Sequence, residues 1–504
     1  MPQNRPHIIL IMTDQQRWDT IGAWGCDYMV TPNMDRLAEE GVSFRQAYCP
    51  GATCIASRAA IFTGMYPHTT GVYSFNNWGK HRNWVQDLND TGYFCANIGK
   101  MHFSPRDIAG GFHERVIVEN PTSRARASGG ADDDWGRFLA HHGLERPNGR
   151  DQTDPEWKQK YQGIPWHYEE RFHSDFFIGD SALGWIDQNR HEGPVFLQIG
   201  FTGPHEPWDP MPRHLEMYRD RPMPPRSFRE GELADKPPQQ EAHKRSLAQA
   251  QHESIIDMYT PTEEAIAEMR RHYYAKVTTV DEKLGEVLDA LEKTGMLDNS
   301  LVIFCSDHGE LIGDHTMAYK WLMYDQIVHV PLIICDRRAA RGGSGAGASV
   351  GDLVSLMDLG PTVLEAAGIE PPTYLEGRSL LPYVEGDSNQ MSPRQYVYSE
   401  DNYLVMMRSQ THKLVYYIGQ EEGELYDLAT DPEELWNLWE SEKHRSIKQE
   451  LLSDLLAWMA GSTYYNAGYR RDRSRNYRMR WPSDGDFYLH GGHGQNLPRP
   501  SDLL

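Results

Sequence analysis

The chain has 504 residues, with 50 Lys and Arg against 72 Asp and Glu, and its formal net charge is −22. That length is too great for one small domain and allows a large buried core. Because the net charge repels polyanions, we expect no nucleic acid partner and no anionic membrane partner.

The cysteines and the apolar runs indicate the cellular compartment in which we expect the protein. Six cysteines show neither a paired metal-binding spacing nor the density of a disulfide framework; they stand at positions 26, 49, 54, 95, 305 and 335. The apolar run of residues 8–12 is too short for the core of a signal sequence, and no later run could span a membrane. We therefore expect a soluble, cytoplasmic protein.

The first predicted element is a buried strand over residues 7–13, a continuous run of mostly β-branched residues. It ends in Asp14 and Gln15, and open α/β sheets place their ligands at the carboxyl ends of their strands. On these residues alone, Asp14 could equally cap a helix or a turn. A helix is predicted next, from residue 31 to a stop at Gly41.

Residues 52–64 predict a loop that turns into a helix, with small and hydroxyl residues first and an apolar run that ends at Gly64. Cys54 is predicted at the helix N-terminus, where unpaired N–H groups and the helix dipole favour an anion. Arg58 follows about one turn later and could bind the same anion. These residues alone leave open a simple packing role for a buried cysteine.

Two later segments carry further candidate residues. Residues 96–102 continue a strand-like pattern that brings Lys100 and His102, which could also be alternate residues on a solvated strand face. Residues 194–200 predict another buried strand, and His205 follows it in a turn between two prolines.

Between and after these strands lie less regular regions. Residues 105–190 show no clean periodicity and predict loops and short helices around the mouth of a site. Residues 222–260 predict a long polar flap, and residues 262–294 predict a helix from apolar residues at spacings of three and four.

A strand over residues 301–305 opens onto Asp307 and His308, and Lys320 follows. Because this strand end can face the end of the first strand, two strand ends with acidic side chains converge on one point. Such an arrangement predicts a metal site.

The late chain changes character. Residues 336–352 predict a mobile loop, and residues 355–364 predict the start of a helix. After residue 372 the pattern predicts an antiparallel sheet and a final helix; the segments are 396–398, 404–407, 414–417 and 446–459. The last forty residues, rich in Arg, Tyr and Trp, predict a tail or an arm packed on the body or on a neighbouring subunit. We divide the chain into an N-terminal domain, a C-terminal subdomain and a C-terminal arm or tail, over residues 1–371, 372–462 and 463–504.

In this order along the chain, several motifs resemble those of the sulfatases. They are Asp14-Gln15, Thr31-Pro32-Asn33-Met34-Asp35-Arg36-Leu37-Ala38, Cys54-Ile55-Ala56-Ser57-Arg58, Gly99-Lys100-Met101-His102, Pro204-His205-Glu206-Pro207 and Ser306-Asp307-His308-Gly309 with Lys320. Ala56 stands where sulfatases more commonly have proline. This difference affects which maturation system would act on the motif.

The resemblance implies an alkaline-phosphatase-like α/β sandwich, in which helices flank a large, mostly parallel central sheet. It implies a catalytic N-terminal domain and a smaller C-terminal α+β subdomain with an antiparallel sheet. The implied reaction is hydrolysis of a sulfate ester, from a sulfated small molecule or saccharide, to an alcohol and inorganic sulfate. A maturation enzyme would oxidise Cys54 to formylglycine, whose hydrated aldehyde is the nucleophile.

The resemblance also implies a role for each site residue. The ligands of one divalent metal would be Asp14, Gln15, residue 54, Asp307 and His308, and their oxygen-rich set suits Ca²⁺ best, with Mg²⁺ or Mn²⁺ as alternatives. Asp307 would also take the proton of the nucleophile. Arg58, Lys100 and Lys320 would bind and stabilise the transferred group. His205 or Lys320 would protonate the leaving alcohol, and His102 would assist the release of sulfate.

Two alternatives stay open. A phosphonate monoester or phosphate diester hydrolase on the same scaffold fits Asp14-Gln15 and Asp307-His308 equally well, whereas Lys100 with His102 favours a sulfatase. A non-catalytic binder of sulfated glycans is disfavoured by the intact set of basic residues. We further expect that the C-terminal arm could mediate a homo-oligomer.

Overall fold

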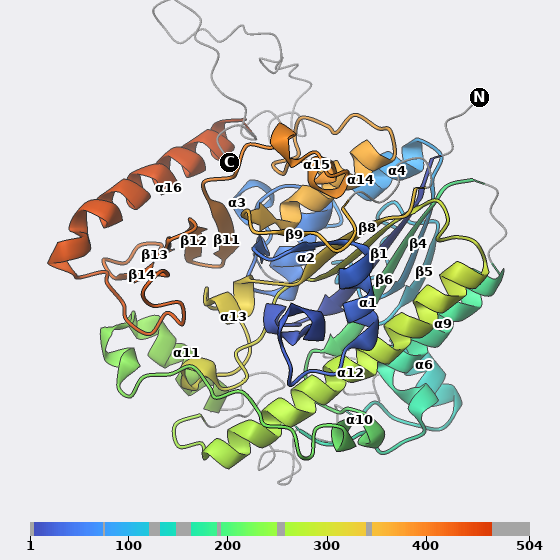
Figure 1. Cartoon of the computed structure of the whole chain (residues 1–504), viewed down its shortest axis with the longest axis horizontal. Coiled ribbons are helices and arrows are strands. Elements are labelled where there is room, and N and C mark those ends of the chain that lie inside the picture. The colour runs from blue at the N-terminus through green and yellow to red at the C-terminus, as the bar shows by residue number, and fades with distance from the viewer. Residues whose placement is uncertain are drawn as a thin grey trace, which may run out of the picture.

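The computed structural model describes residues 5–73, 76–119, 132–147, 163–188, 193–248, 258–338 and 345–465. Within these residues, an eight-stranded sheet forms the centre of the molecule (Figure 1). Its strands, in spatial order, are β5 (Glu114–Ile117), β4 (Phe94–Gly99), β6 (Val195–Pro204), β1 (His7–Asp14), β7 (Ser300–Ser306), β8 (Leu332–Asp336), β2 (Val42–Phe44) and β9 (Ser349–Val350). The first five run parallel, and β8 runs antiparallel to both of its neighbours.

The register of the central strands brings their carboxyl ends together. Thr13 of β1 lies opposite Ser306 of β7, so the residues that follow, Asp14 and Asp307, lie side by side. On the other flank, Gly99 at the end of β4 lies opposite Gly200 of β6. Three strand ends therefore border one region, as expected for the ligand-binding edge of an open α/β sheet.

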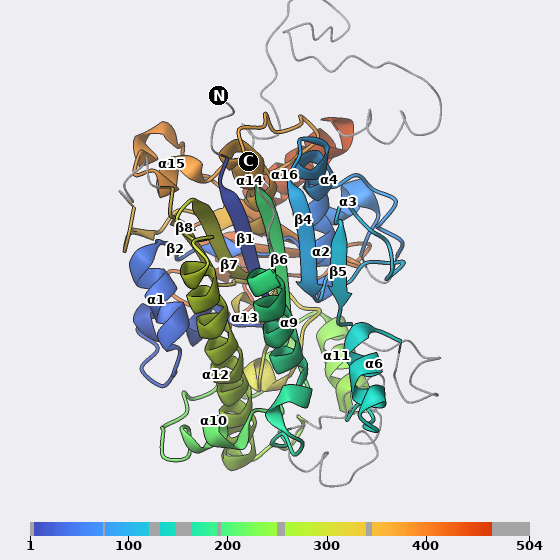
Figure 2. The ribbon, with the colours of Figure 1, turned by 90° about the vertical axis from the view of Figure 1, so that its right-hand side faces the viewer.

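Helices cover both faces of the sheet (Figure 2). The long α12 (Glu263–Lys293), α9 (Ser174–Gln188) and α1 (Pro32–Glu40) pack on one face, and α2 (Cys54–Thr63), α4 (Trp84–Asp90) and α14 (Leu359–Ala366) pack on the other. Alternate residues of β1 point into the two layers, with Ile9 and Ile11 in the first and Ile8 and Leu10 in the second. Burial on both faces explains why β1 is a continuous apolar run.

A second sheet lies beside the sandwich. Its four antiparallel strands, in order, are β11 (Val397–Asp401), β12 (Leu404–Arg408), β13 (His412–Tyr417) and β14 (Gly423–Asp427), and α16 (Arg445–Tyr465) packs against them. The backbone N–H of Glu400 donates to the Pro50 carbonyl at 3.0 Å, which fixes β11 against the segment that precedes α2. A two-stranded parallel pair, β3 (Ala47–Tyr48) with β10 (Val354–Ser355), lies nearby.

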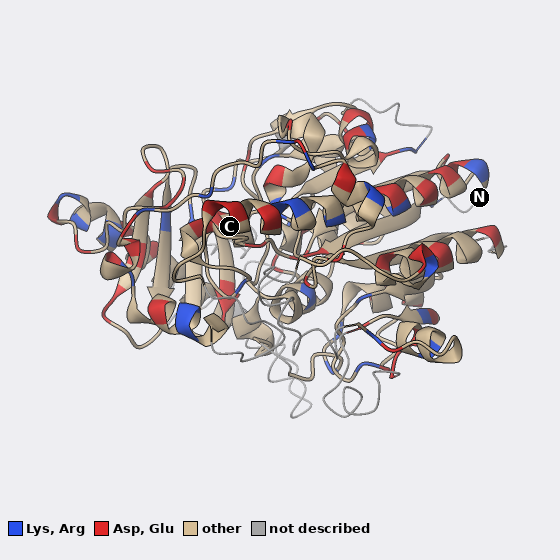
Figure 3. Ribbon diagram, turned by 90° about the horizontal axis from the view of Figure 1, so that it is seen from below, with Lys and Arg blue, Asp and Glu red and all other residues tan. Residues whose placement is uncertain are grey.

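The remaining helices are short. They are α3 (Pro67–Thr70), α6 (Asp134–His141), α10 (Pro212–Glu216), α11 (Pro238–Ala248), α13 (Asp325–Val328) and α15 (Leu381–Val384). Lys and Arg are interspersed with Asp and Glu over the ribbon rather than gathered on one element (Figure 3). In the described part of the chain, no helix combines the length and apolar character needed to cross a bilayer. All six cysteines are buried and unbridged.

The predicted fold class is confirmed, with a mostly parallel sheet between helices and a later antiparallel sheet. One regional prediction is wrong. Residues 105–190 are not only loops and short helices, because the fifteen-residue α9 packs on the sheet and against α12. The predicted flap contains a regular helix, α11. Residues 120–131, 148–162, 249–257, 339–344 and 466–504 lie outside the described residues, and with them most of the predicted C-terminal arm.

Candidate active site

The start of α2 places Cys54. Thr53 is the N-cap with extended backbone (φ −142°, ψ 151°), Cys54 is the first helical residue, and Gly64 ends the helix at φ 67°, a left-handed conformation that glycine adopts without strain. Cys54 is buried, with 7% of its surface exposed. The Ser57 hydroxyl donates to the Asp307 carbonyl at 2.6 Å and so ties α2 to the end of β7.

Four buried charges lie next to Cys54, and we name Asp14, Arg58, Lys100 and Asp307 the ion-pair side. The Arg58 Nε donates to Asp307 Oδ2 at 2.6 Å, and the Lys100 ammonium pairs with the Asp14 carboxylate. Arg58 also donates to the Lys100 carbonyl at 2.7 Å and lies 3.8 Å from Asp14 Oδ2. Burial alone would raise the pKa of Asp14, but the surrounding cations, Lys100 first among them, hold it well below its usual range.

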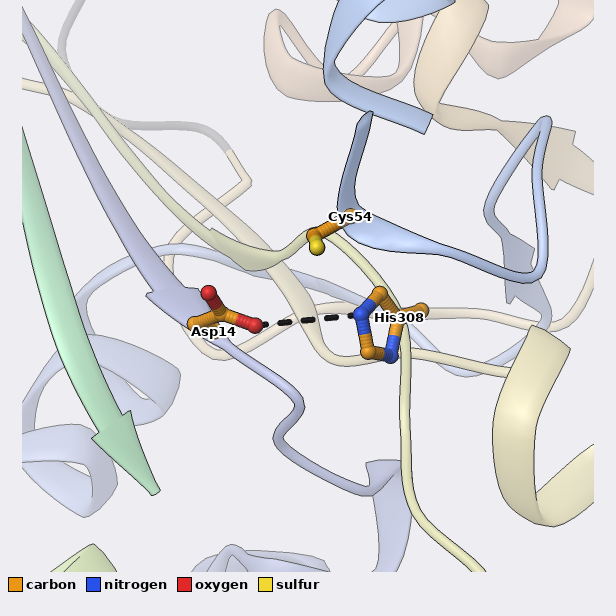
Figure 4. Close-up of side chains that lie close together, drawn as sticks. All are labelled: Asp14, Cys54 and His308. Carbon is orange, nitrogen blue, oxygen red and sulfur yellow. Dashed lines mark ion pairs between the residues drawn. The ribbon is translucent and has the colours of Figure 1, made fainter. Parts of the chain in front are cut away.

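Asp14, Cys54 and His308 form a group that could hold a metal ion. One ligand atom from each lies within 4.8 Å of the others, and the three side chains point toward one another (Figure 4). The His308 Nδ1 donates to the Gly309 carbonyl at 2.8 Å, so in the neutral imidazole Nε2 is the acceptor nitrogen. That Nε2 lies 3.7 Å from Asp14 Oδ1 and 3.8 Å from Asp307 Oδ1.

Two buried acceptor atoms face each other at this point, and a cation could bind between them. Neither His308 Nε2 nor Asp14 Oδ1 has a hydrogen-bond partner among the described residues, although both are fully buried. Two buried lone pairs directed at each other are unfavourable unless a cation lies between them. The predicted ligands Asp14, Asp307 and His308 therefore meet at one point, with Cys54 beside them.

Gln15 lies elsewhere, on what we name the histidine side, which comprises Gln15, His205, Glu206 and Lys320. The Lys320 ammonium donates to Gln15 Oε1 at 2.6 Å and to His205 Nε2 at 2.8 Å. Gln15 Nε2 donates to Glu206 Oε2 at 3.0 Å and to the Glu310 carboxylate. The amide oxygen that was predicted to bind the metal is thus turned toward Lys320, while its backbone N–H donates to Asp307 Oδ1 at 3.1 Å.

The hydrogen bonds of His205 define its tautomer. Its Nδ1 donates to the Glu206 carbonyl at 2.7 Å, so Nε2 accepts from Lys320. Burial, and then the charge of Lys320, lowers the pKa of His205 well below its usual range. Burial would lower the pKa of Lys320, but Cys54, Glu206 and Asp14 raise it above the usual value. Of Lys320 and His205, Lys320 is therefore the group that carries a proton to donate.

Lys100 and His102 follow β4 and do not lie on the strand face, because β4 ends at Gly99. His102 has φ 61°, a backbone conformation that is uncommon among residues other than glycine. Glu119 Oε1 accepts from the N–H groups of Met101 at 3.0 Å and His102 at 2.5 Å, and it holds the backbone there. Burial, and then Lys100, lowers the pKa of His102 to about 3.

Comparison with known proteins identifies the family. The sequence profile described as "Sulfatase" matches residues 6–369, and a second, described as "N-sulphoglucosamine sulphohydrolase, C-terminal", matches residues 313–460. The chain belongs to the sulfatase family. It is accordingly an enzyme of the sulfuric ester hydrolase class, in the alkaline phosphatase superfamily.

Relatives of this sulfatase act on different esters. An arylsulfatase of Clostridium perfringens is 30% identical over 478 residues, which cover 91% of this chain and 95% of that protein. An N-acetylglucosamine-6-O-sulfatase of Bacteroides thetaiotaomicron is 26% identical over 89% of this chain and 85% of that protein. Among solved structures, a phosphonate monoester hydrolase of Agrobacterium radiobacter is similar with a TM-score of 0.77 and 26% identity, over 91% of this chain and 96% of that one.

The structure brings all ten predicted site residues of this sulfatase into one region. It also adds buried carboxylates that sequence analysis missed, namely Glu119, Glu206, Glu310 and Asp401. Glu206 stands inside a motif that had been recognised and Glu310 directly follows another, so their positions carried a signal. Glu119 and Asp401 stand in no such motif, and nothing in the residues around them marked them out.

Proposed function

We propose that this enzyme hydrolyses a sulfate monoester, with formylglycine formed from Cys54 as the nucleophile. The observation that carries the proposal is the pairing of Lys100 with Asp14 beside Cys54, because it puts a cation next to the predicted nucleophile within the group that could hold a metal. The Lys100 and His102 pair is also the feature that favours sulfate over phosphorus esters on this scaffold.

The proposal includes one divalent metal ion and a formylglycine. Asp14, Asp307, His308 and residue 54 would hold one divalent cation, with Ca²⁺ suited to the oxygen-rich set and Mg²⁺ or Mn²⁺ as alternatives. When bound, such a cation neutralises charge on the sulfate oxygens and on the nucleophile. A hydrated formylglycine supplies two hydroxyl groups, one to attack and one to drive the later release of sulfate.

The chain's own residues bind the anion and move the protons. Arg58 and Lys100 present fixed positive charge to the sulfate oxygens, and this electrostatic contribution is usually the largest in such reactions. The Lys320 Nζ is directed at His205 and Gln15 and has a third N–H available to protonate the leaving alcohol. His102 is neutral at physiological pH because its pKa is about 3, and its ring can accept the proton whose removal accompanies release of sulfate.

A phosphonate monoester or phosphate diester is the second candidate substrate. The structural likeness to a phosphonate monoester hydrolase and the histidine at position 308 support it. A phosphate monoester carries nearly two negative charges and a sulfate monoester one, so a cationic site alone does not select between the two chemistries. The choice must be measured.

Two measurements test the proposal. The mass of the peptide that contains residue 54 should be about 18 Da lower than that of the cysteine form, and Cys54→Ala should abolish turnover without unfolding the protein. Cys49→Ala is the matched control, because Cys49 is a buried cysteine of the same segment whose thiol contacts the Gly51 carbonyl. Full activity from protein with unmodified Cys54 would refute the nucleophile.

The ester class is decided by comparing kcat/KM for an aryl sulfate and an aryl phosphonate monoester in the same preparation. We expect the sulfate to be the better substrate. A higher kcat/KM for the phosphonate would favour the second candidate instead.

A further inference from the structure

Asp401 reaches the site from the C-terminal sheet. It is the last residue of β11, and the hydrogen bond from Glu400 to the Pro50 carbonyl fixes this strand end beside the segment that leads into Cys54. The Asp401 side chain lies next to Thr53, the N-cap of α2, close enough for the Thr53 hydroxyl to influence its titration.

The Asp401 carboxylate is buried without a cation. Its side chain is 1% exposed, and no ion pair joins it to any described residue. Oδ1 accepts from the Asn402 side chain at 2.8 Å, whereas Oδ2 has no hydrogen-bond partner in the described parts of the chain. Burial raises the pKa of this carboxyl to about 7, although Thr53 and, more weakly, Lys320 act in the opposite direction. A buried acceptor without a donor is costly and calls for an explanation.

Asp401 is as deeply buried as the groups predicted to react. Cys54 and Lys320, which must contact the substrate, are 7% and 4% exposed, so burial of Asp401 does not separate it from them. Lys320 acts electrostatically on Asp401 as well as on Cys54. The carboxylate therefore lies beside the segment that carries residue 54, on the side formed by the C-terminal sheet.

Trp321 borders the same segment from another element. Its backbone N–H donates to the Ala52 carbonyl at 3.1 Å, and its φ of 75° is strained for so bulky a residue. The ring lies 5.8 Å from the Lys320 ammonium and 5.7 Å from the His243 ring. A buried acceptor thus lies next to Thr53, and a tryptophan is bonded through its backbone to the neighbouring Ala52. Acceptors and aromatic residues are combined in this way in sites that bind a hydroxylated or amino-bearing ring.

We propose that Asp401 binds the alcohol part of the substrate by accepting, at Oδ2, a hydrogen bond from one of its O–H or N–H groups. The inference rests on the proposed function and names its substrate class, the sulfate ester of a polyhydroxylated or amino alcohol, such as a sulfated sugar. The Thr53 hydroxyl is a protein donor next to this carboxylate, and the lone pairs that one hydroxyl leaves unfilled can accept a further donor from the substrate. An aryl sulfate without a donor leaves the carboxylate unpaired.

The experiment compares wild-type enzyme with Asp401→Asn, which places an N–H₂ donor where the acceptor stood. The substrates are phenyl sulfate, glucose 6-sulfate and glucosamine 6-sulfate, which carry no donor, hydroxyl donors, and hydroxyl plus ammonium donors. We expect Asp401→Asn to lower kcat/KM for a sugar sulfate by about 10- to 100-fold and to change that for phenyl sulfate less than about threefold. A larger loss with glucosamine 6-sulfate than with glucose 6-sulfate would identify the ammonium as the donor, and equal losses would identify a hydroxyl.

Asp427→Asn is the matched control, since Asp427 ends β14 of the same sheet and accepts from Ala429 in its own turn. Activity of Asp401→Asn on phenyl sulfate shows that the variant is folded; if it does not fold, Asp401→Glu, which keeps the charge and displaces the oxygen, replaces it. Equal losses on all three substrates, or no loss on either sugar, would overturn the inference.

Failure of the proposed function gives a different result. In that case wild-type enzyme turns over none of the sulfates, and the comparison moves to binding of the same three compounds by Cys54→Ala protein, measured by calorimetry. A Kd that Asp401→Asn raises for the sugars alone supports the inference even then, and a Kd unchanged for all three overturns it.

Discussion

On the ion-pair side of the site each buried cation has a carboxylate partner, whereas on the histidine side Lys320 donates to a neutral amide and a neutral imidazole. Both sides border residue 54, yet they hold charge differently. The two carboxylates and two cations of the ion-pair side balance one another within a fully buried cluster. The histidine side instead aligns an ammonium with groups that only accept its proton.

The difference suggests a division of labour. Fixed ion pairs suit a site that must hold a metal and a sulfate without rearranging, because their dipoles are set before the substrate arrives. An ammonium between neutral acceptors suits proton transfer, because its hydrogen bonds to described residues go to Gln15 and His205 and not to a carboxylate. A substitution on one side should therefore impair the function of that side and leave the function of the other side intact.

The largest effect is expected from Asp307→Asn. The amide keeps the shape of the side chain but removes the charge opposite Arg58 and one predicted ligand of the metal. A metal that stabilises charge contributes several kcal/mol, so we expect turnover to fall by about 10³-fold or more. Elemental analysis of the purified variant should show metal loss, and an excess of Ca²⁺ or Mn²⁺ should restore part of the rate. Full metal content with full activity would contradict the assignment.

His102→Ala should give the next largest effect, and it should act on one step. A well-placed base contributes roughly 10²–10⁴-fold in rate, and His102 is assigned to the release of sulfate. Rapid-quench measurement with an aryl sulfate should then show one equivalent of phenol released quickly and sulfate released slowly. Lys100→Ala is the contrasting variant, since loss of its charge should slow both steps. A His102→Ala enzyme without a burst would remove the histidine from this role.

Lys320→Ala should make the rate depend on the leaving alcohol. Without its proton donor, the enzyme should lose about 10²-fold or more with a poorly acidic alcohol and much less with a nitrophenol, which needs no proton to leave. Lys100→Ala should lose activity evenly across the same series of esters. The measurement is kcat/KM for substituted aryl and alkyl sulfates. An even loss with Lys320→Ala would mean that the two sides of the site do not differ as proposed.

Sequence reasoning reached the parts of the site that depend on strand ends and helix starts. Asp14 and Asp307 follow two buried strands, and parallel pairing in register brings them together. Cys54 follows an N-cap and begins an apolar helix, so the local sequence pattern also predicted its position. These are short-range or topological features, and the hydrophobic pattern encodes them.

What sequence reasoning missed depends on tertiary contacts. The α9 sequence mixes apolar and acidic residues without a clean helical stripe, and its helix is stabilised by packing against α12 and β6. The side chain of Gln15 was predicted toward the metal, but it lies between Lys320 and two carboxylates that come from distant segments. Glu119 and Asp401 become site residues only through contacts made across the fold.

The smallest effect is expected at Glu119, which touches neither the substrate nor the metal and acts through His102. Glu119→Ala removes the acceptor for two backbone N–H groups and frees a strained conformation at His102, so we expect about a 10-fold loss confined to sulfate release. Glu119→Gln keeps an acceptor oxygen and should recover most of that rate. The readout is the ratio of the burst rate to the steady-state rate, because a general loss of stability would lower the active fraction but leave this ratio unchanged. If Glu119→Ala leaves the ratio as in wild type, the backbone of His102 is held by other contacts, and Glu119 belongs to neither side of the site.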